Sequence, residues 1–166
     1  MSRQIYLVTH GKKLDGPDPG LTPIGKLQTK RLGEYLPARP KTVVCGTGER
    51  HLQTASILGL EPKRFSVIIG TPESKSTEKN IVILANGTKI PYELYTSVAD
   101  RKEAFLNLVQ NLPHLTVVIT SRSMIYVLDF NGTPKSAAIY VYEPARETIE
   151  ELFAASEDIG AGRDEV

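Results

Sequence analysis

LVTHGKKLDGPDPGLTPIG, residues 7–25, carries the signals of three successive structural elements. It begins inside a short β-branched run, continues as a loop rich in Gly, Pro and Asp, and ends at a helix start. Thr22 is a suitable N-cap residue, and Pro23 fits the first helical position. The stretch therefore predicts a strand, then a loop that carries His10 and Gly11, then a helix.

Strands and helices are predicted to alternate along most of the chain. Three segments are short and almost entirely apolar, as strands covered on both faces must be; they are residues 4–9, 42–45 and 115–120. Helical patterns separate them, over residues 23–36, 49–58 and 97–111. The first helix is expected to bury one apolar stripe, made of Ile24, Leu27, Leu32, Tyr35 and Leu36. This alternation predicts an α/β fold, a three-layer αβα sandwich around a mostly parallel sheet.

The rest of the chain is less regular. Residues 65–69 are predicted to form a strand, residues 71–80 a polar loop and residues 81–90 a hairpin with an Asn86-Gly87 turn. Near the end we expect a helix, a strand and a last helix, over residues 124–130, 137–142 and 146–155. The sequence leaves open whether residues 71–95 form a lid over a site.

Composition limits the classes of protein to consider. The 166 residues suit one domain over residues 1–155, followed by a flexible acidic tail at 156–166. A net charge of +1 argues against binding nucleic acid or a membrane through bulk charge. Cys45 is the sole cysteine, so neither an internal disulfide nor a structural metal site is expected. The short apolar segments predict no signal peptide or membrane span, and hence a cytoplasmic protein.

Three motifs occur in a fixed order in the first third of the chain. They read THG at residues 9–11, LTPIG at 21–25 and RHLQTA at 50–55. With them the chain resembles the histidine phosphatase superfamily, the phosphoglycerate mutase-like proteins, and its length is similar to that of the short phosphohistidine phosphatase branch. The resemblance implies a phosphoglycerate mutase-like fold, His10 as a nucleophile that becomes phosphorylated, and Arg50 as a phosphate clamp. It also implies a phosphorylated small molecule or phosphoprotein as partner, and no metal or cofactor.

Two positions depart from the family pattern. Thr9 stands where the family has an arginine, and Ser121 stands where it has a second histidine. Two of the four charged groups of the family's pocket are therefore replaced. Removing one preorganised donor costs a factor of about 10²–10³ in rate, so this loss could abolish turnover.

Neighbouring residues could compensate in part. Gly11, Lys12, Ser121 and Arg122 are our candidate phosphate-binding residues, with Lys13 as a further source of charge. Arg122 and the lysines would supply positive charge, although a lysine acts as a mobile point charge. Ser121 can donate one hydrogen bond to a phosphoryl oxygen.

The general acid is not singled out by any motif. The candidates in the middle of the chain are Glu73, Glu78, Glu93 and Asp100. Among other reactive side chains, Cys45 is expected to be a small buried thiol and His114 to belong to a loop. His51 points about 100° away from Arg50 on a helix, so we expect it on the surface.

Two functions from different classes follow from this pattern. The first is a phosphomonoesterase or phosphohistidine phosphatase that works through a phosphohistidine at His10. The alternative is a catalytically impaired relative that binds phosphate, or a phosphorylated ligand or partner, without turnover. A third hypothesis is a scaffold for protein contacts alone, because a fold by itself does not determine function.

Overall fold

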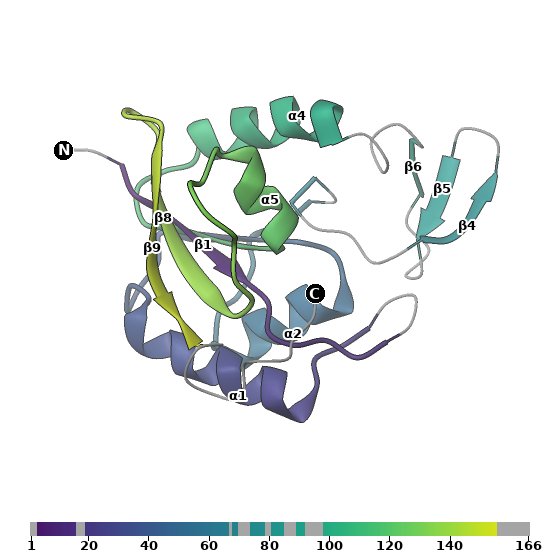
Figure 1. Cartoon of the computed structure of the whole chain (residues 1–166), viewed down its shortest axis with the longest axis horizontal. Coiled ribbons are helices and arrows are strands. Elements are labelled where there is room, and N and C mark those ends of the chain that lie inside the picture. Colours follow the sequence, from purple (N-terminus) through teal and green to yellow (C-terminus); the bar gives the residue numbers. More distant parts are fainter. Residues whose placement is uncertain are drawn as a thin grey trace.

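A six-stranded sheet with helices on both faces forms the main body of the molecule (Figure 1). The computed structural model describes residues 3–15, 19–66, 68–69, 74–78, 81–84, 89–91 and 98–155. The sheet has the order β3-β2-β7-β1-β8-β9. Its strands are β1 (Ile5–Thr9), β2 (Thr42–Cys45), β3 (Arg64–Phe65), β7 (Thr116–Thr120), β8 (Ala138–Glu143) and β9 (Thr148–Ala154). The predicted α/β fold with a mostly parallel sheet is confirmed.

The parallel strands end together at one edge of the sheet. β1 runs parallel to β7, with Thr9 opposite Thr120, and β7 runs parallel to β2, with Ile119 opposite Cys45. β3 continues this parallel set beyond β2. β8 and β9 complete the sheet as antiparallel neighbours on the other side of β1. Ligands of open α/β sheets bind beyond such carboxyl ends.

Each face of the sheet has its own core. Successive residues of a strand point to opposite faces, so Val44 and Val118 pack toward α4 (Val98–Gln110) and α5 (Arg122–Val127). Val43 and Val117 pack on the other face, with α1 (Pro23–Leu32) and α2 (Glu49–Ile57). Figure 1 shows these two helix layers above and below the sheet.

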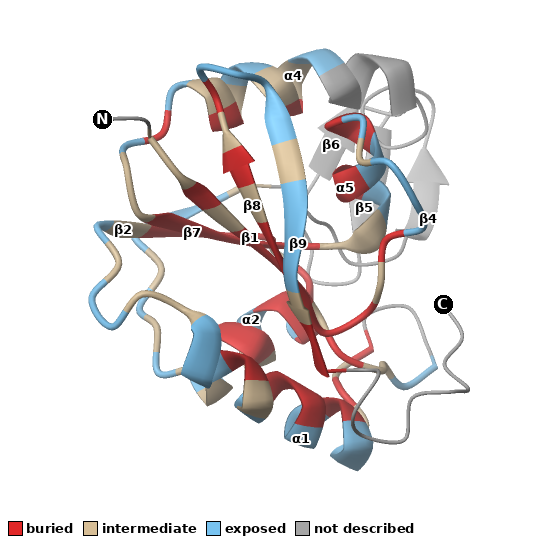
Figure 2. Ribbon diagram, turned by 60° about the vertical axis from the view of Figure 1, so that its left-hand side comes forward, coloured by how far each residue is buried: buried red, intermediate tan, exposed pale blue. Residues whose placement is uncertain are grey.

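α1 begins as predicted but buries a different face. The Thr22 hydroxyl accepts a hydrogen bond from the Gly25 N–H (3.0 Å) and caps the helix. The buried side of α1 carries Gly25, Gln28, Thr29 and Leu32 and faces the sheet (Figure 2). Ile24, Leu27 and Tyr35, all expected in the buried stripe, are 40%, 56% and 40% exposed. The reason is a backbone contact: a Cβ on Gly25 would overlap the Lys12 carbonyl oxygen, so the glycine must face inward.

The last predicted helix is wrong. Residues 146–155 contain β9, which pairs with β8 from Thr148 opposite Glu143 to Ala154 opposite Ala138, with one shift of register between Tyr140 and Ile139. Pairing with a neighbouring strand overrides local helix propensity here. Glu147, in the turn before β9, has a φ of 53°, which a helix does not allow.

The middle of the chain also differs from its prediction. The expected strand at 65–69 contains only the last residue of β3, and the expected loop at 71–80 contains β4 (Ser74–Glu78). β4 pairs with β5 (Ile81–Leu84), and β5 pairs with β6 (Lys89–Pro91), in a separate three-stranded sheet. The pairing of β5 with β6 agrees with the predicted hairpin. Its Asn86-Gly87 turn, much of the 71–95 segment and the 156–166 tail lie outside the described residues.

The remaining helices agree with the sequence in place and type. Gly59 ends α2 with a φ of 69°, and its N–H donates to the Ser56 carbonyl (3.1 Å). α5 starts two residues before the predicted 124–130 helix. A short 3-10 turn, η1 (Gly33–Tyr35), extends α1. Among the described residues, no helix is both long and apolar enough to cross a membrane.

Candidate active site

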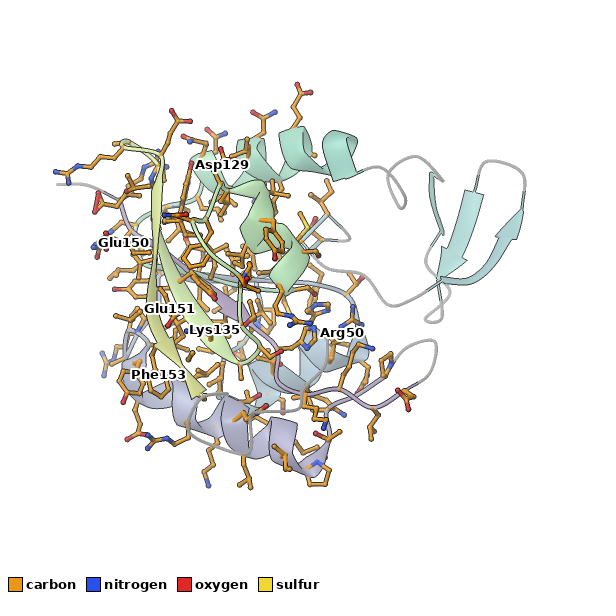
Figure 3. All side chains as sticks on the ribbon, in the orientation of Figure 1. Arg50, Asp129, Lys135, Glu150, Glu151 and Phe153 are labelled. Carbon is orange, nitrogen blue, oxygen red and sulfur yellow. The ribbon has the colours of Figure 1, made fainter. Side chains whose placement is uncertain are left out.

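Five polar side chains converge at the carboxyl edge of the parallel strands. His10 directly follows β1, and Ser121 and Arg122 directly follow β7. Arg50 and His51 lie in the first turn of α2, which starts after β2. Figure 3 shows Arg50 beside this edge, between α2 and the end of β1. We call His10, Arg50, His51, Ser121 and Arg122 the strand-end site.

Two hydrogen bonds fix the tautomer of His10. Its Nδ1 lies 2.9 Å from the Gly11 carbonyl oxygen, which can only accept, so Nδ1 carries the proton. The Arg50 Nε–H donates to His10 Nε2 (3.2 Å), so Nε2 presents its lone pair to Arg50. The ring is neutral in this arrangement, and its unprotonated nitrogen points into the strand-end site.

The surroundings of His10 oppose its protonation. Burial, together with the charges of Arg50, Arg122 and Lys13, lowers the pKa of His10 from 6.5 to about 3. The Gly11 carbonyl acts in the opposite direction. A neutral imidazole with a free Nε2 lone pair is the form that can attack an electrophile.

The backbone around His10 is clamped between two elements. The His10 carbonyl accepts from the Ala137 N–H (2.9 Å), just before β8. On the other side, a Cβ on Gly11 would lie 2.5 Å from the Gly25 carbonyl oxygen of α1. The expected role of Gly11 in phosphate binding is thus accompanied by a packing role that only glycine can fill.

Motif residues of RHLQTA and LTPIG contact one another and hold Arg50 in place. Gln53 Oε1 accepts from the Leu21 N–H (2.7 Å), and a Cβ on Gly20 would lie 2.8 Å from the Gln53 amide nitrogen. The Thr54 hydroxyl donates to the Arg50 carbonyl (2.7 Å) within α2. The motifs therefore join α2 to the loop after β1, and Arg50 is 9% exposed at this junction.

The expectation that His51 lies on the surface is wrong, because its side chain is fully buried. Its Nε2 lies 2.9 Å from Ser121 Oγ, and its ring meets the His10 ring edge to face with 5.5 Å between centroids. α2 begins beneath the sheet edge, so two sides of its first turn face the strand-end site. Arg50 uses one side toward β1, and His51 uses the other toward β7.

A sequence signal for His51 does exist in the turn before α2. Gly48 caps α2, and its N–H donates to His51 Nδ1 (3.2 Å), three residues on, as a capping-box side chain does. A Cβ on Gly48 would lie 2.9 Å from His51 Nδ1 and 3.0 Å from an Arg50 guanidinium nitrogen. The sequence signal for a buried His51 is therefore a glycine that follows a predicted strand and precedes the histidine by three residues.

The two departures from the family pattern differ in their surroundings. Thr9 is fully buried, and its hydroxyl donates to the Lys135 carbonyl (2.7 Å) and accepts from the Ala138 N–H (2.9 Å). It is thus engaged within the protein, next to β8. Ser121 is partly buried at the start of α5 and faces His51.

The positively charged candidate residues contribute in two ways, through side-chain charge and through backbone hydrogen bonds. Arg122 and Lys13 add positive charge close enough to His10 to lower its pKa. Lys12 contributes backbone contacts: its N–H donates to Gln28 Oε1 (3.1 Å) and its carbonyl accepts from the Thr22 N–H (2.9 Å).

Other reactive side chains lie elsewhere or outside the description. Burial raises the pKa of the Cys45 thiol to about 12, in agreement with the expected buried thiol. His114 lies in the loop before β7, and its Nδ1 accepts from the Gln4 N–H (3.0 Å). The structure does not describe the side chains of the four candidate acids, Glu73, Glu78, Glu93 and Asp100. No group of three metal-ligating side chains occurs within the part of the chain that the structure describes.

Solved structures share the fold of this chain. No protein-family model matches the chain, and no curated protein matches its sequence. The phosphoglycerate mutase from Thermus thermophilus superimposes with a TM-score of 0.63 at 17% identity, over 90% of this chain and 98% of that chain. The fold is phosphoglycerate mutase-like.

Two further solved structures share the fold. TTHB049 from Thermus thermophilus has a TM-score of 0.65 at 17% identity, over 90% of this chain and 99% of that chain. The product of the open reading frame Rv3214 from Mycobacterium tuberculosis has a TM-score of 0.61 at 17% identity, over 93% of this chain and 98% of that chain. The phosphoglycerate mutase-like fold thus extends well beyond the first third of the sequence, which carries the motifs.

Proposed function

We propose that this chain is a histidine phosphatase-like protein that removes a phosphoryl group from a phosphorylated small molecule or phosphoprotein through His10. One observation carries this proposal: the hydrogen bonds of His10 with Gly11 and Arg50 leave a neutral ring whose Nε2 lone pair faces a guanidinium. A nucleophile for phosphorus needs that tautomer, and the transferring group needs a fixed positive charge beside it.

The proposed reaction has two steps. In the first, the Nε2 lone pair of His10 forms a bond to phosphorus while the bond from phosphorus to the ester oxygen breaks, and the leaving oxygen takes up a proton. In the second, a water oxygen attacks phosphorus, the bond between nitrogen and phosphorus breaks, and Nε2 regains its lone pair as the water loses a proton. Nδ1 keeps its proton throughout, and its N–H stays hydrogen-bonded to the Gly11 carbonyl.

Arg50 takes part in both the resting and the loaded site. At rest its Nε–H occupies the Nε2 lone pair. An incoming phosphoryl group offers the guanidinium stronger, charged acceptors, which releases Nε2 for attack. Arg122 and Lys13, whose charges already act on His10, would add to the attraction for an anion.

The second candidate is a protein that binds a phosphorylated ligand without turnover. A specific observation favours it: the Thr9 hydroxyl is engaged by Lys135 and Ala138, so the position supplies no charge to the strand-end site. Ser121 offers only a neutral donor. The same site would then hold phosphate and stop before, or after, transfer to His10.

The deciding experiment measures phosphate release from an aryl phosphate and from phosphohistidine. It compares the wild type with His10→Gln and with His114→Gln, a matched control because His114 lies in a loop at the opposite end of β7. We expect turnover by the wild type and the control, and none by His10→Gln, with all three folded by circular dichroism. Equal turnover in His10→Gln would overturn the enzymatic proposal.

The binding candidate has its own signature. A saturable rise in melting temperature with inorganic phosphate, lost in Arg50→Gln, supports a phosphate site. The same rise without turnover of either substrate favours the second candidate. Absence of any phosphate effect on the wild type argues against both candidates and for a scaffold role.

A further inference from the structure

His51 and Ser121 form a directed pair inside the strand-end site. The Gly48 N–H donates to His51 Nδ1 (3.2 Å), so Nδ1 is an acceptor and the proton of a neutral ring sits on Nε2. That Nε2–H donates to Ser121 Oγ (2.9 Å). The direction of both bonds is fixed by a backbone amide, which can only donate.

The direction of the bond from His51 to Ser121 excludes one role for the pair, the activation of Ser121 as a nucleophile. A serine activated as a nucleophile must donate its proton to an unprotonated imidazole nitrogen. Here the nitrogen that faces Ser121 already carries a proton. His51 is therefore no general base for Ser121 in this arrangement.

The same direction leaves the Ser121 proton available for another acceptor. Ser121 stands at the start of α5, but its side chain makes no capping bond to that helix. Its oxygen accepts the His51 bond, so its own O–H is not used on His51. Ser121 is partly buried and follows Thr120 of β7, which lies opposite Thr9, the residue before His10.

We infer that His51 is a positioning residue that turns Ser121 into a donor of a hydrogen bond to a phosphoryl oxygen. This inference rests on the proposed function of the strand-end site. The relay runs from Gly48 through His51 to Ser121, and each bond polarises the next. An imidazole from the first turn of α2 thus contributes, through a hydroxyl, at the place where the sequence resemblance predicts a histidine after β7.

Two substitutions of His51 distinguish its hydrogen bond to Ser121 from the space that its side chain fills. Glutamine extends far enough to place an amide N–H near the position of Nε2, so His51→Gln keeps the donor to Ser121. Asparagine can still accept from the Gly48 N–H, but it is too short to reach Ser121 Oγ. Ser121→Ala removes the hydroxyl and disturbs no helix cap, which makes it a variant that should fold.

The experiment is a double-mutant cycle on the dissociation constant for inorganic phosphate, measured by isothermal titration calorimetry. His51→Asn and Ser121→Ala should each weaken binding about three- to tenfold, the range of one hydrogen bond. The double variant should be no weaker than Ser121→Ala alone, and His51→Gln should retain most of the affinity. A merely structural His51 would instead weaken binding equally with or without Ser121.

Nitrogen-15 spectra of the imidazole rings give a readout that needs no ligand. We expect a neutral His51 with its proton on Nε2; a proton on Nδ1 would overturn the inference. If the wild type binds phosphate and both single variants bind it equally well, this inference fails alone. If the wild type and Arg50→Gln bind none, the proposed function fails as well.

Discussion

His10 owes its tautomer to neighbours that single-residue reasoning does not reveal. The sequence places it after a strand, but the Gly11 carbonyl and the Arg50 guanidinium decide which nitrogen carries the proton. The surface prediction for His51 was wrong for a different reason. A rule of helix geometry separated it from Arg50, whereas the start of α2 under the sheet edge buries both.

The lowered pKa of His10 predicts a pH-dependent loss of stability. Between pH 6.5 and about 3 the unfolded chain protonates this histidine while the folded chain does not, so the free energy of unfolding falls with falling pH in that window. Below about 3 both states are protonated and the effect is complete. Urea titrations at about pH 7 and about pH 4 span most of that window. The loss of unfolding free energy between them should be smaller for His10→Gln than for the wild type. Equal losses would show that His10 titrates normally in the folded protein.

The site histidine also predicts where a trapped phosphoryl group would be found. Because Nδ1 is held by the Gly11 carbonyl, phosphorylation should occur on Nε2. Rapid alkaline quenching during turnover of an aryl phosphate, followed by phosphorus NMR, distinguishes the two isomers. A phosphoryl group on Nδ1 would contradict the geometry described here.

At the scale of elements, buried strands and capped helices could be predicted, and pairings could not. β1, β2 and β7 are apolar on both faces, and α1 and α2 carry Pro23 and Gly59 at their ends, so local chemistry defines them. β9 lacks such a signal. Its polar, helix-compatible sequence becomes a strand because β8 offers it a partner. The face of α1 was hidden for a related reason, since the Lys12 backbone selects it.

Two glycines of the α1 region should respond in opposite ways to a methyl group. Gly25→Ala drives a Cβ into the Lys12 carbonyl oxygen, so we expect a loss of roughly 1–3 kcal/mol in unfolding free energy from overpacking. Gly33→Ala is the control: its φ is −57°, and its Cβ would meet the nearest side chain at 3.7 Å. Chemical denaturation should find that variant unchanged or slightly more stable. Similar losses at both positions would contradict the interlock of α1 with the loop after β1.

Thr9 offers a second test at the join between β1 and β8. Thr9→Val keeps the shape but leaves the buried Ala138 N–H without its acceptor, at a cost of about 1–3 kcal/mol. Thr9→Ser keeps the hydroxyl and should cost less. Thermal unfolding of the two variants compares them directly, and the idea fails if valine is tolerated as well as serine.

For the whole molecule, β9 ties the end of the described chain to α1. The Phe153 ring stacks on Tyr35 with 3.9 Å between centroids, and the Arg31 guanidinium lies 5.8 Å from the same ring. Leu152, next to it in the strand, is 47% exposed and lies at an irregularity in the pairing, between Glu151 opposite Tyr140 and Phe153 opposite Ile139. The two neighbours therefore differ in their surroundings: Phe153 is partly buried against the core, whereas Leu152 is exposed.

Alanine at these two positions therefore tests how β9 packs against α1 and η1. Phe153→Ala should destabilise the protein by about 2–4 kcal/mol, because it removes a large, partly buried ring and its stacking. Leu152→Ala should change the unfolding free energy by no more than about 0.5 kcal/mol. Denaturant midpoints of both variants provide the comparison, and equal effects would contradict the packing of Phe153 against Tyr35.

The direction of β9 has a practical consequence for handling this protein. β9 runs the same way as β1. The Ala155 N–H donates to the Ala137 carbonyl (2.8 Å), and the Ala137 N–H in turn donates to the His10 carbonyl. A tag or fusion partner attached just after β9 would thus emerge beside the histidines, whereas one attached before β1 would emerge from the opposite edge of the sheet. Surface immobilisation for ligand measurements should accordingly use the amino-terminal side.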